Sequence, residues 1–282
     1  CAFSERRVFP VITADCHLHT QFSTDSEAPM KSMIEAAIEK GLRTVCFTEH
    51  LDYDYPPEDG KEGTPIFLVD MPAYQKTLFE LRERYRGKIE VLFGIEIGMM
   101  PYLGERCEAF VRSWPFDFVI ASSHLVEGRD PYNPSFFEGI SEEEAYADYF
   151  RTIPANVKAF SAFHTYAHLD YVVRYGPHRN ERYSYEKYRE QLEPALRLLI
   201  ESGKALEVNT GGYRYGLGQP NPHLDVLRAY RELGGELITI GSDAHAPADV
   251  AREFALLSEL LPSLGFAHYA VYKNGAPELR SF

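Results

Sequence analysis

The alternation of buried-strand patterns with amphipathic helix patterns constrains the fold of this chain more than any other feature. Runs of three to five mostly apolar residues alternate with segments whose apolar residues recur at helical spacing. Such alternation is typical of a parallel sheet covered by helices, because parallel strands need a crossover connection. The expected strands are 8–12, 44–47, 89–93, 117–121, 161–163, 205–208, 236–240 and 269–272. The expected helices are 30–38, 74–85, 102–114, one starting at 141, 184–203, 224–233 and 248–261.

About seven strand–helix units follow one another without a linker, a repeat or a low-complexity segment. This favours one closed or nearly closed barrel. We therefore expect an α/β fold: a distorted, TIM-like (β/α)7 barrel in a single domain spanning residues 1–282. An open doubly wound sheet is the alternative, and it is disfavoured because no glycine-rich nucleotide fingerprint follows any strand.

The composition limits the partners of the protein. The formal net charge of −13 disfavours nucleic acid, whereas a small anionic substrate fits if metal ions and arginines make the pocket locally positive. No apolar run approaches the length of a membrane span, and the N-terminal segment lacks the apolar core of a signal peptide. The four cysteines are widely spaced, which is typical of reduced thiols, so we expect a cytoplasmic protein with a small-molecule partner.

The first expected strand runs into the segment 15–20, Asp-Cys-His-Leu-His-Thr. Alternate side chains of extended backbone share a face, so His17 and His19 would point the same way and chelate one divalent ion. Asp15 beside them could orient an imidazole through its second nitrogen. Taken alone, a His-x-His pair is weak evidence for a metal site.

Histidines and carboxylates also follow the other expected strands. The carboxyl ends of parallel barrel strands converge on one face, where such enzymes keep their catalytic groups. We therefore predict a metal site on that face. The predicted ligands are His17, His19, Asp25, His50, Glu96, His124, His168, Asp243 and His245.

This ligand set contains nitrogen and oxygen but no thiolate, which suits zinc, manganese or iron. Nine ligands exceed what one ion can use, so they indicate two or three divalent ions with a bridging carboxylate. Glu96 is the expected bridge, because its flanking glycines let the strand end approach the ions closely. Sites of this kind clamp a phosphate and lower the pKa of a bound water.

Six segments together resemble the successive motifs of the PHP (polymerase and histidinol phosphatase) superfamily. They are residues 15–20, 47–50, 94–96, 122–124, 168–171 and 241–245. The stretches at 47–52 and 171–177 most resemble its monofunctional histidinol-phosphatase branch. The resemblance implies a seven-stranded barrel with a trinuclear cluster, and hydrolysis of L-histidinol phosphate to L-histidinol and phosphate in histidine biosynthesis.

Carried over position by position, the resemblance divides the ligands among three ions. The three sets are His17, His19, Glu96 and Asp243; Glu96, His124 and His168; and Asp25, His50 and His245. Many family members have histidine at the position of Asp25, so the third set is more anionic here.

Catalytic and substrate contacts complete the predicted site. Arg174 is the choice for a bidentate phosphate contact, because its planar fork matches two phosphate oxygens. Carboxylates or an amide would suit the ammonium and imidazole of the substrate. The predicted catalytic residues are Glu96, Asp243, His245 and Arg174. The predicted substrate-binding residues are Arg174, His178, Glu127, Asn209 and Asp52.

Alternative interpretations remain open from the sequence. Another phosphoesterase of the same superfamily could act on nucleotides or other small phosphomonoesters. An amidohydrolase also uses His-x-His, but it usually bridges its metals with a lysine after the fourth strand, where this chain has the segment 122–124. A non-catalytic, metal-dependent binding module would need the same ligands. Arg174 could also be a loop arginine paired with an acid.

Overall fold

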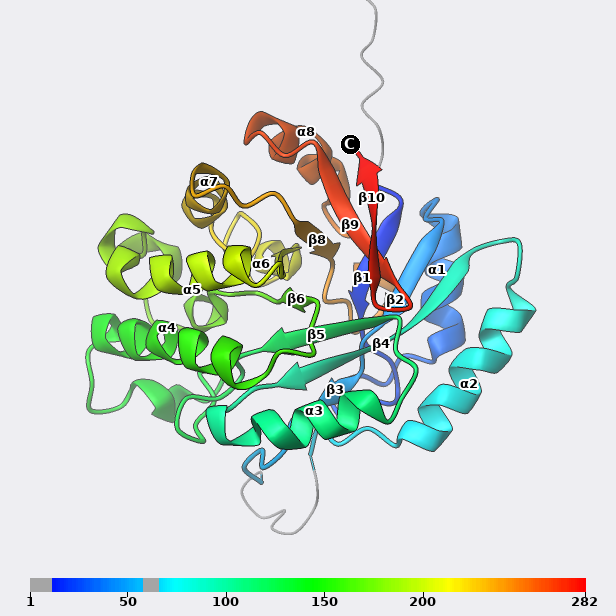
Figure 1. Cartoon of the computed structure of the whole chain (residues 1–282), viewed down its shortest axis with the longest axis horizontal. Helices are drawn as coiled ribbons and strands as arrows, with labels where there is room; N and C mark the ends of the chain where they lie inside the picture. The colour runs from blue at the N-terminus through cyan, green and yellow to red at the C-terminus, as the bar shows by residue number, and fades with distance from the viewer. Residues whose placement is uncertain (1–11, 58–65) are drawn as a thin grey trace, which may run out of the picture.

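The computed structural model describes residues 12–57 and 66–282. Seven parallel strands follow one another around the centre of the molecule in the order β1-β2-β4-β5-β6-β7-β8, and β3 also pairs with β4 (Figure 1). The strands are β1 (Ala14–Leu18), β2 (Thr44–Phe47), β3 (His50–Leu51), β4 (Glu90–Gly98), β5 (Phe118–Ser122), β6 (Thr165–Tyr166), β7 (Ala205–Asn209) and β8 (Ile238–Gly241).

The first and last strands of this order meet at their carboxyl ends. The amide of Asp243 donates to the carbonyl of His17 at 2.9 Å, and the amide of His19 donates to the carbonyl of Ala244 at 2.9 Å. Strand β3 continues β2, because both pair with β4 in one parallel register. The expected α/β fold with a nearly closed barrel of seven parallel strands is confirmed.

Helices surround the strands on the outside, except for the one-turn α6, which lies at the carboxyl end of β7 (Figure 1). They are α1 (Met30–Glu39), α2 (Met71–Arg84), α3 (Gly104–Arg112), α4 (Glu142–Ala159), α5 (Arg189–Glu201), α6 (Gly211–Arg214), α7 (Leu224–Glu232) and α8 (Phe254–Ser263). Their apolar faces and the strands bury one continuous core, to which Phe47, Phe93 and Tyr166 contribute. The helix expected to start at 141 is α4, which begins with a capping box. The Ser141 hydroxyl accepts from the Glu144 amide, and the Glu144 carboxylate accepts from the Ser141 amide.

Three expected elements need correction. The strand expected at 161–163 is wrong, because β6 begins at Thr165. The helix expected at 248–261 starts only at Phe254, since Glu253 has left-handed backbone with φ of 60°. Most of the strand expected at 8–12 lies outside the described residues, and β1 starts at Ala14, so His17 lies within the strand.

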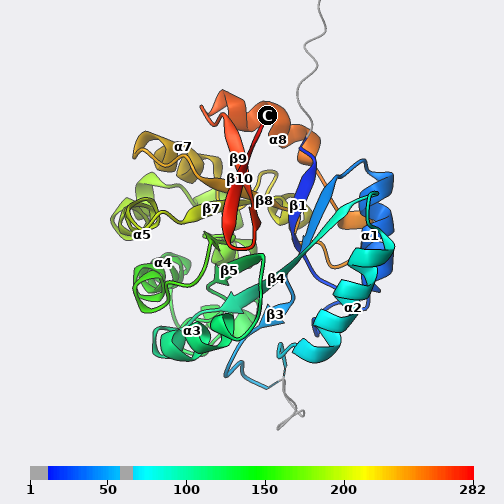
Figure 2. The same cartoon turned by 45° about the vertical axis from the view of Figure 1, so that its right-hand side comes forward.

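The strand expected at 269–272 is one arm of an antiparallel hairpin, β9 (His268–Lys273) and β10 (Ala276–Ser281), which crosses the barrel (Figure 2). The amide of Gly275 donates to the Asp117 carbonyl at the start of β5. The hairpin therefore packs at the amino ends of the strands, opposite the predicted site.

Two expectations about the chain bear on its surroundings. No helix within the described ranges is long and apolar enough to cross a bilayer. Cys16, Cys46 and Cys107 are buried free thiols. Cys1 lies outside the described residues.

Candidate metal centre

The nine predicted ligands gather at the carboxyl ends of the strands. His17 lies on β1, His50 begins β3 and Glu96 lies on β4. The other six follow β1, β5, β6 and β8 in loops. The parallel barrel thus brings together side chains that are far apart in the sequence.

Glu96 lies at the centre of this cluster and is fully buried. Its Oε2 atom lies 3.0 Å from His50 Nδ1, 3.2 Å from His17 Nε2 and 3.4 Å from His19 Nε2. Despite these short distances, none of these four atoms makes a hydrogen bond to any described residue. Buried polar atoms are normally hydrogen-bonded. The lone pairs of these four atoms converge instead on a space that suits a cation.

The second oxygen of Glu96 faces another pair of histidines. Oε1 lies 3.0 Å from His168 Nε2 and 3.3 Å from His124 Nε2, and it accepts a hydrogen bond from the Ser122 hydroxyl at 2.6 Å. Because its two oxygens face two separate groups of nitrogens, Glu96 has the geometry of a bridging carboxylate.

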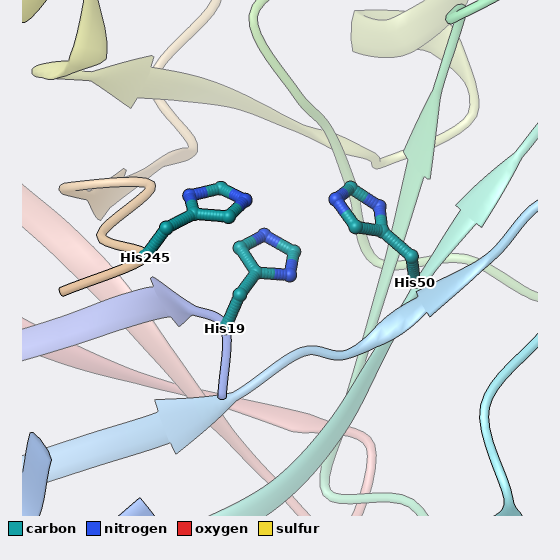
Figure 3. Close-up of side chains that lie close together, drawn as sticks. All are labelled: His19, His50 and His245. Atoms are coloured by element: carbon teal, nitrogen blue, oxygen red, sulfur yellow. The ribbon is translucent and has the colours of Figure 1, made fainter. Parts of the chain in front are cut away.

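A third group lies beside the first, as Figure 3 shows, with the imidazole of His19 between those of His50 and His245. The ring centroids of His50 and His245 lie 4.1 and 4.3 Å from that of His19. Asp25 Oδ2 lies 3.0 Å from His245 Nε2 and 3.5 Å from His50 Nε2. The Asp25 side chain is 40% exposed and that of His245 21%, so solvent reaches the cluster from this side.

Asp243 completes the first group from the loop after β8. Its Oδ1 atom lies 3.7 Å from His19 Nε2 and 3.9 Å from His17 Nε2. Both Asp243 and His168 have positive φ, at 56° and 25°. Holding a non-glycine residue at positive φ costs conformational free energy. Such residues are concentrated at sites where function requires a particular side-chain direction.

The cluster strongly shifts the pKa values of its members. Burial favours a neutral Glu96 carboxyl, but the charges of His17, His50 and His124 outweigh burial and hold its pKa well below the usual range. Burial likewise opposes charge on His124, and Asp52 and Glu96 overcome it, which raises the pKa of His124 to about 10. Glu96 is therefore ionised at neutral pH and attracts cations.

Carboxylates contact the outer nitrogens of two of these rings, and a serine hydroxyl contacts that of a third. Glu207 Oε1 lies 2.6 Å from His17 Nδ1, and Asp52 Oδ1 lies 2.6 Å from His124 Nδ1. His19 Nδ1 lies 3.2 Å from Ser23 Oγ, which donates to Glu49. Sequence analysis missed Glu207, although a carboxylate in the middle of an apolar strand is a signal that could have found it.

Asp15 does not take the role expected for it. Its carboxylate accepts hydrogen bonds from the Ser242 amide at 2.9 Å, from the Ser242 hydroxyl and from the Ala251 amide. Nδ1 of His17, the nitrogen that points away from Glu96, lies 2.6 Å from Glu207 Oε1 instead. Asp15 thus joins β1 to the segment after β8, and the expectation that it orients an imidazole is wrong.

Arg174 lies beside Asp243 and is buried. Its guanidinium donates to Asp243 Oδ2 at 2.9 Å, to Asn209 Oδ1 at 3.1 Å and to Asn221 Oδ1 at 2.8 Å. It is therefore not an exposed loop arginine. Sequence analysis missed a second arginine, Arg214 on α6, whose Nη2 donates to the Asp243 carbonyl at 2.8 Å.

The other predicted substrate contacts lie in different surroundings. Asn209 is fully buried, and its amide bonds to Glu207 and Arg174. Asp52 is buried against His124. Glu127 is exposed and lines a cleft of about 480 Å³ beside α4, while His178 Nδ1 lies 2.9 Å from a Glu142 oxygen. Their contacts with substrate remain predictions.

Comparison with known proteins agrees with this arrangement. The PHP domain family matches residues 15–211, which is more than half of the chain. The chain belongs to the PHP domain family. A histidinol-phosphatase of Lactococcus lactis is 34% identical over 264 residues, which cover 92% of this chain and 94% of that protein. The family resemblance found in the motifs is thereby confirmed.

Solved structures show the same architecture. The histidinol phosphate phosphatase of Lactococcus lactis, in complex with zinc, L-histidinol and phosphate, matches with a TM-score of 0.85 and 31% identity. The match covers 94% of this chain and 98% of that chain. A Listeria monocytogenes structure matches with a TM-score of 0.74 at 20% identity, over 86% of this chain and 99% of that chain, and supports the fold alone.

Proposed function

We propose that this PHP domain protein hydrolyses L-histidinol phosphate to L-histidinol and phosphate with the help of divalent metal ions. The observation that carries the proposal is Glu96, a buried carboxylate with five histidine nitrogens within 3.4 Å. The substrate follows from the Lactococcus lactis relative, whose structure contains zinc, L-histidinol and phosphate and aligns over nearly the whole chain.

The residues present fit two or three divalent ions. The support is the set of buried, unpaired nitrogens around Glu96, with only nitrogen and oxygen donors, as zinc accepts. The proposed sets are His17, His19, Glu96 and Asp243; Glu96, His124 and His168; and Asp25, His50 and His245. Such ions, when bound, would polarise the phosphate and lower the pKa of a water molecule.

The protein's own residues would bind and orient the phosphate. Arg174 presents a guanidinium already fixed by Asp243, Asn209 and Asn221, so little side-chain entropy is lost when it binds a phosphate oxygen. The phosphate would enter past Asp25 and His245, the most exposed members of the cluster. Buried surroundings exclude water and strengthen these electrostatic contacts.

The range and location of this activity are part of the proposal. We propose that the chain acts as one domain, which the hydrogen bonds between β1 and the loop after β8 support. We also propose a cytoplasmic location, which the free thiols of Cys16, Cys46 and Cys107 support.

The test is phosphate release from L-histidinol phosphate against a panel of nucleotide and sugar monophosphates. Zinc- or manganese-loaded protein is compared with Glu96→Gln, which keeps the side-chain shape and removes the charge. We expect a strong preference for L-histidinol phosphate that the variant loses. Preference for another phosphomonoester would overturn the substrate, and the absence of any phosphate release would overturn the hydrolase itself.

A further inference from the structure

Glu207 lies in the middle of β7 and is 1% exposed. Its Oε1 atom lies 2.6 Å from Nδ1 of His17, whose other nitrogen faces Glu96. A charge-assisted contact this short fixes the direction of an imidazole plane. The carboxylate therefore lies behind the ring, on the side away from the cluster.

The other oxygen of Glu207 has two different donors. Oε2 accepts from the backbone amide of His168 at 3.0 Å and from the side-chain amide of Asn209 at 2.9 Å. His168 has a φ of 25°, which is unfavourable backbone for an L residue. One carboxylate thus holds the ring of His17 and the backbone of His168, which face opposite oxygens of Glu96.

Strand β8 lies between β7 and β1, and it leaves room for the contact between Glu207 and His17 only because it carries Gly241. A Cβ atom at that position would lie 2.3 Å from Cβ of His17 and 2.7 Å from Oε1 of Glu207. These distances are shorter than side chains adopt, so an alanine there would push the pair apart. The contact between Glu207 and His17 depends on three strands, β1, β7 and β8.

We propose that Glu207 is a positioning residue that keeps the proton of His17 on Nδ1 and leaves Nε2 free to bind a metal ion. A carboxylate only accepts hydrogen bonds, so the ring must present an N–H at Nδ1. The outer carboxylate also increases the basicity of the ligating nitrogen. This inference rests on the metal site of the proposed function.

The Glu207→Gln variant tests the assignment sharply. One end of a glutamine accepts and the other end donates. The two donors at Oε2 favour the amide oxygen there, which turns the NH₂ group toward His17 Nδ1. The ring would then carry its proton on Nε2, the nitrogen that faces Glu96, and a ligand would be lost.

The matched control is Asp15→Asn. Asp15 lies on β1, is also buried and also accepts from several donors, the backbone amide of His17 among them, but no imidazole nitrogen depends on it. Both variants therefore replace a buried carboxylate by an amide. Only Glu207→Gln should change the metal site.

We would measure zinc affinity of the metal-free proteins by competition with a chromophoric chelator, and zinc per chain by mass spectrometry. We expect Glu207→Gln to bind the ion held by His17 about 10- to 100-fold more weakly, the usual effect of losing such a partner. Asp15→Asn should bind as wild type. Nitrogen-15 spectra of the zinc-loaded wild type should show the His17 proton on Nδ1.

Each outcome has a defined meaning. If Glu207→Gln is folded and binds zinc as tightly as wild type, the positioning role is overturned. If it does not fold, Gly241→Ala tests the same contact with the carboxylate retained, and wild-type zinc affinity there would overturn the role. If the wild type itself binds neither zinc nor manganese, the proposed function fails instead.

Discussion

Asp52 Oδ1 lies 2.6 Å from His124 Nδ1, while the other nitrogen of the same ring lies 3.3 Å from Glu96 Oε1. The carboxylate comes from the segment after β3, and the histidine comes from the loop after β5. The barrel therefore orients His124 with an acid that comes from beyond the neighbouring strand β4, as it orients His17 with Glu207 from beyond β8.

Replacing Asp52 should weaken metal binding at the set that contains His124. We expect Asp52→Ala to reduce zinc affinity there about 10- to 100-fold, because the ring loses the partner that directs it. Gly98→Ala should act in the same direction, since a Cβ at Gly98 would lie 1.9 Å from Asp52 Oδ1. Chelator competition measures both. Asp54→Asn, at an exposed neighbouring acid, is the control, and equal affinities in all variants would contradict the prediction.

Arg174→Lys should lower kcat/KM for the phosphate ester about 10- to 100-fold, the range expected when charged hydrogen bonds of 1.5–3 kcal/mol are lost. A lysine lacks the planar guanidinium that donates to Asp243, Asn209 and Asn221 at the same time. Steady-state kinetics, with the zinc content of each sample determined, measure the effect. Arg179→Lys, which changes an exposed arginine bonded to the Tyr215 carbonyl, should retain activity. An active Arg174→Lys enzyme would argue against the phosphate contact.

Metal removal should destabilise the protein in a way that depends on metal concentration. An ion that binds only the folded chain stabilises it by about 2.7 kcal/mol at 100 times its Kd. We expect Tm to fall on chelation and to rise again with added zinc. Thermal unfolding followed by circular dichroism measures this. Glu96→Gln should respond much less, and a Tm of the wild type that ignores zinc would contradict the prediction.

His164 should make the protein lose stability in mild acid, independently of the metal site. Burial and the charge of Lys204 lower the pKa of His164 from 6.5 to about 4, and its Nδ1 accepts from the Val119 amide. As the pH falls from 6.5 to 4, the unfolded chain binds a proton that the folded chain does not, so the free energy of unfolding decreases by about 2 kcal/mol.

The variant His164→Asn isolates this contribution, because its side-chain oxygen can replace Nδ1 as the acceptor and does not titrate. Urea unfolding of the metal-free proteins at several pH values measures the difference. The wild type should lose stability relative to the variant as the pH falls through this range. Parallel curves for the two proteins would show that His164 is not responsible.

The capping box at the start of α4 gives a prediction about stability alone. Ser141→Ala should decrease the free energy of unfolding by about 1 kcal/mol, because the hydroxyl no longer accepts from the Glu144 amide. Ser32→Ala removes an exposed hydroxyl in the first turn of α1 and serves as a comparison. Urea unfolding of both variants checks the prediction, which a cost at Ser141 no larger than at Ser32 would contradict.

Sequence periodicity and the positions of the histidines were enough to predict the barrel and the cluster. A ligand such as His50 or His124 closely follows an apolar run, so the run itself indicates where its strand ends. The start of α4 next to residue 141 was predicted for the same local reason. These features depend only on neighbouring residues.

Contacts between segments that are far apart in the sequence were harder to predict. Glu207 and Asp15 are both buried carboxylates near His17, and only the register of β1, β7 and β8 decides which one meets the ring. The extent of β6 was misjudged because it pairs through only two residues, which leaves little pattern. The partners of Arg174 likewise come from β7, the loop after β8 and the loop around Asn221.

The hydrogen bonds that join His17 to Asp243, and His19 to Ala244, have a consequence for biosynthesis. Translation makes His17 and His19 long before Asp243 and His245, because most of the barrel lies between them in the sequence. Nascent chains therefore expose paired imidazoles long before the carboxylate and the last histidine can complete their coordination. The proposed ligand set would be complete only once β1 and the loop after β8 have met, so metal occupancy would report that the barrel has closed.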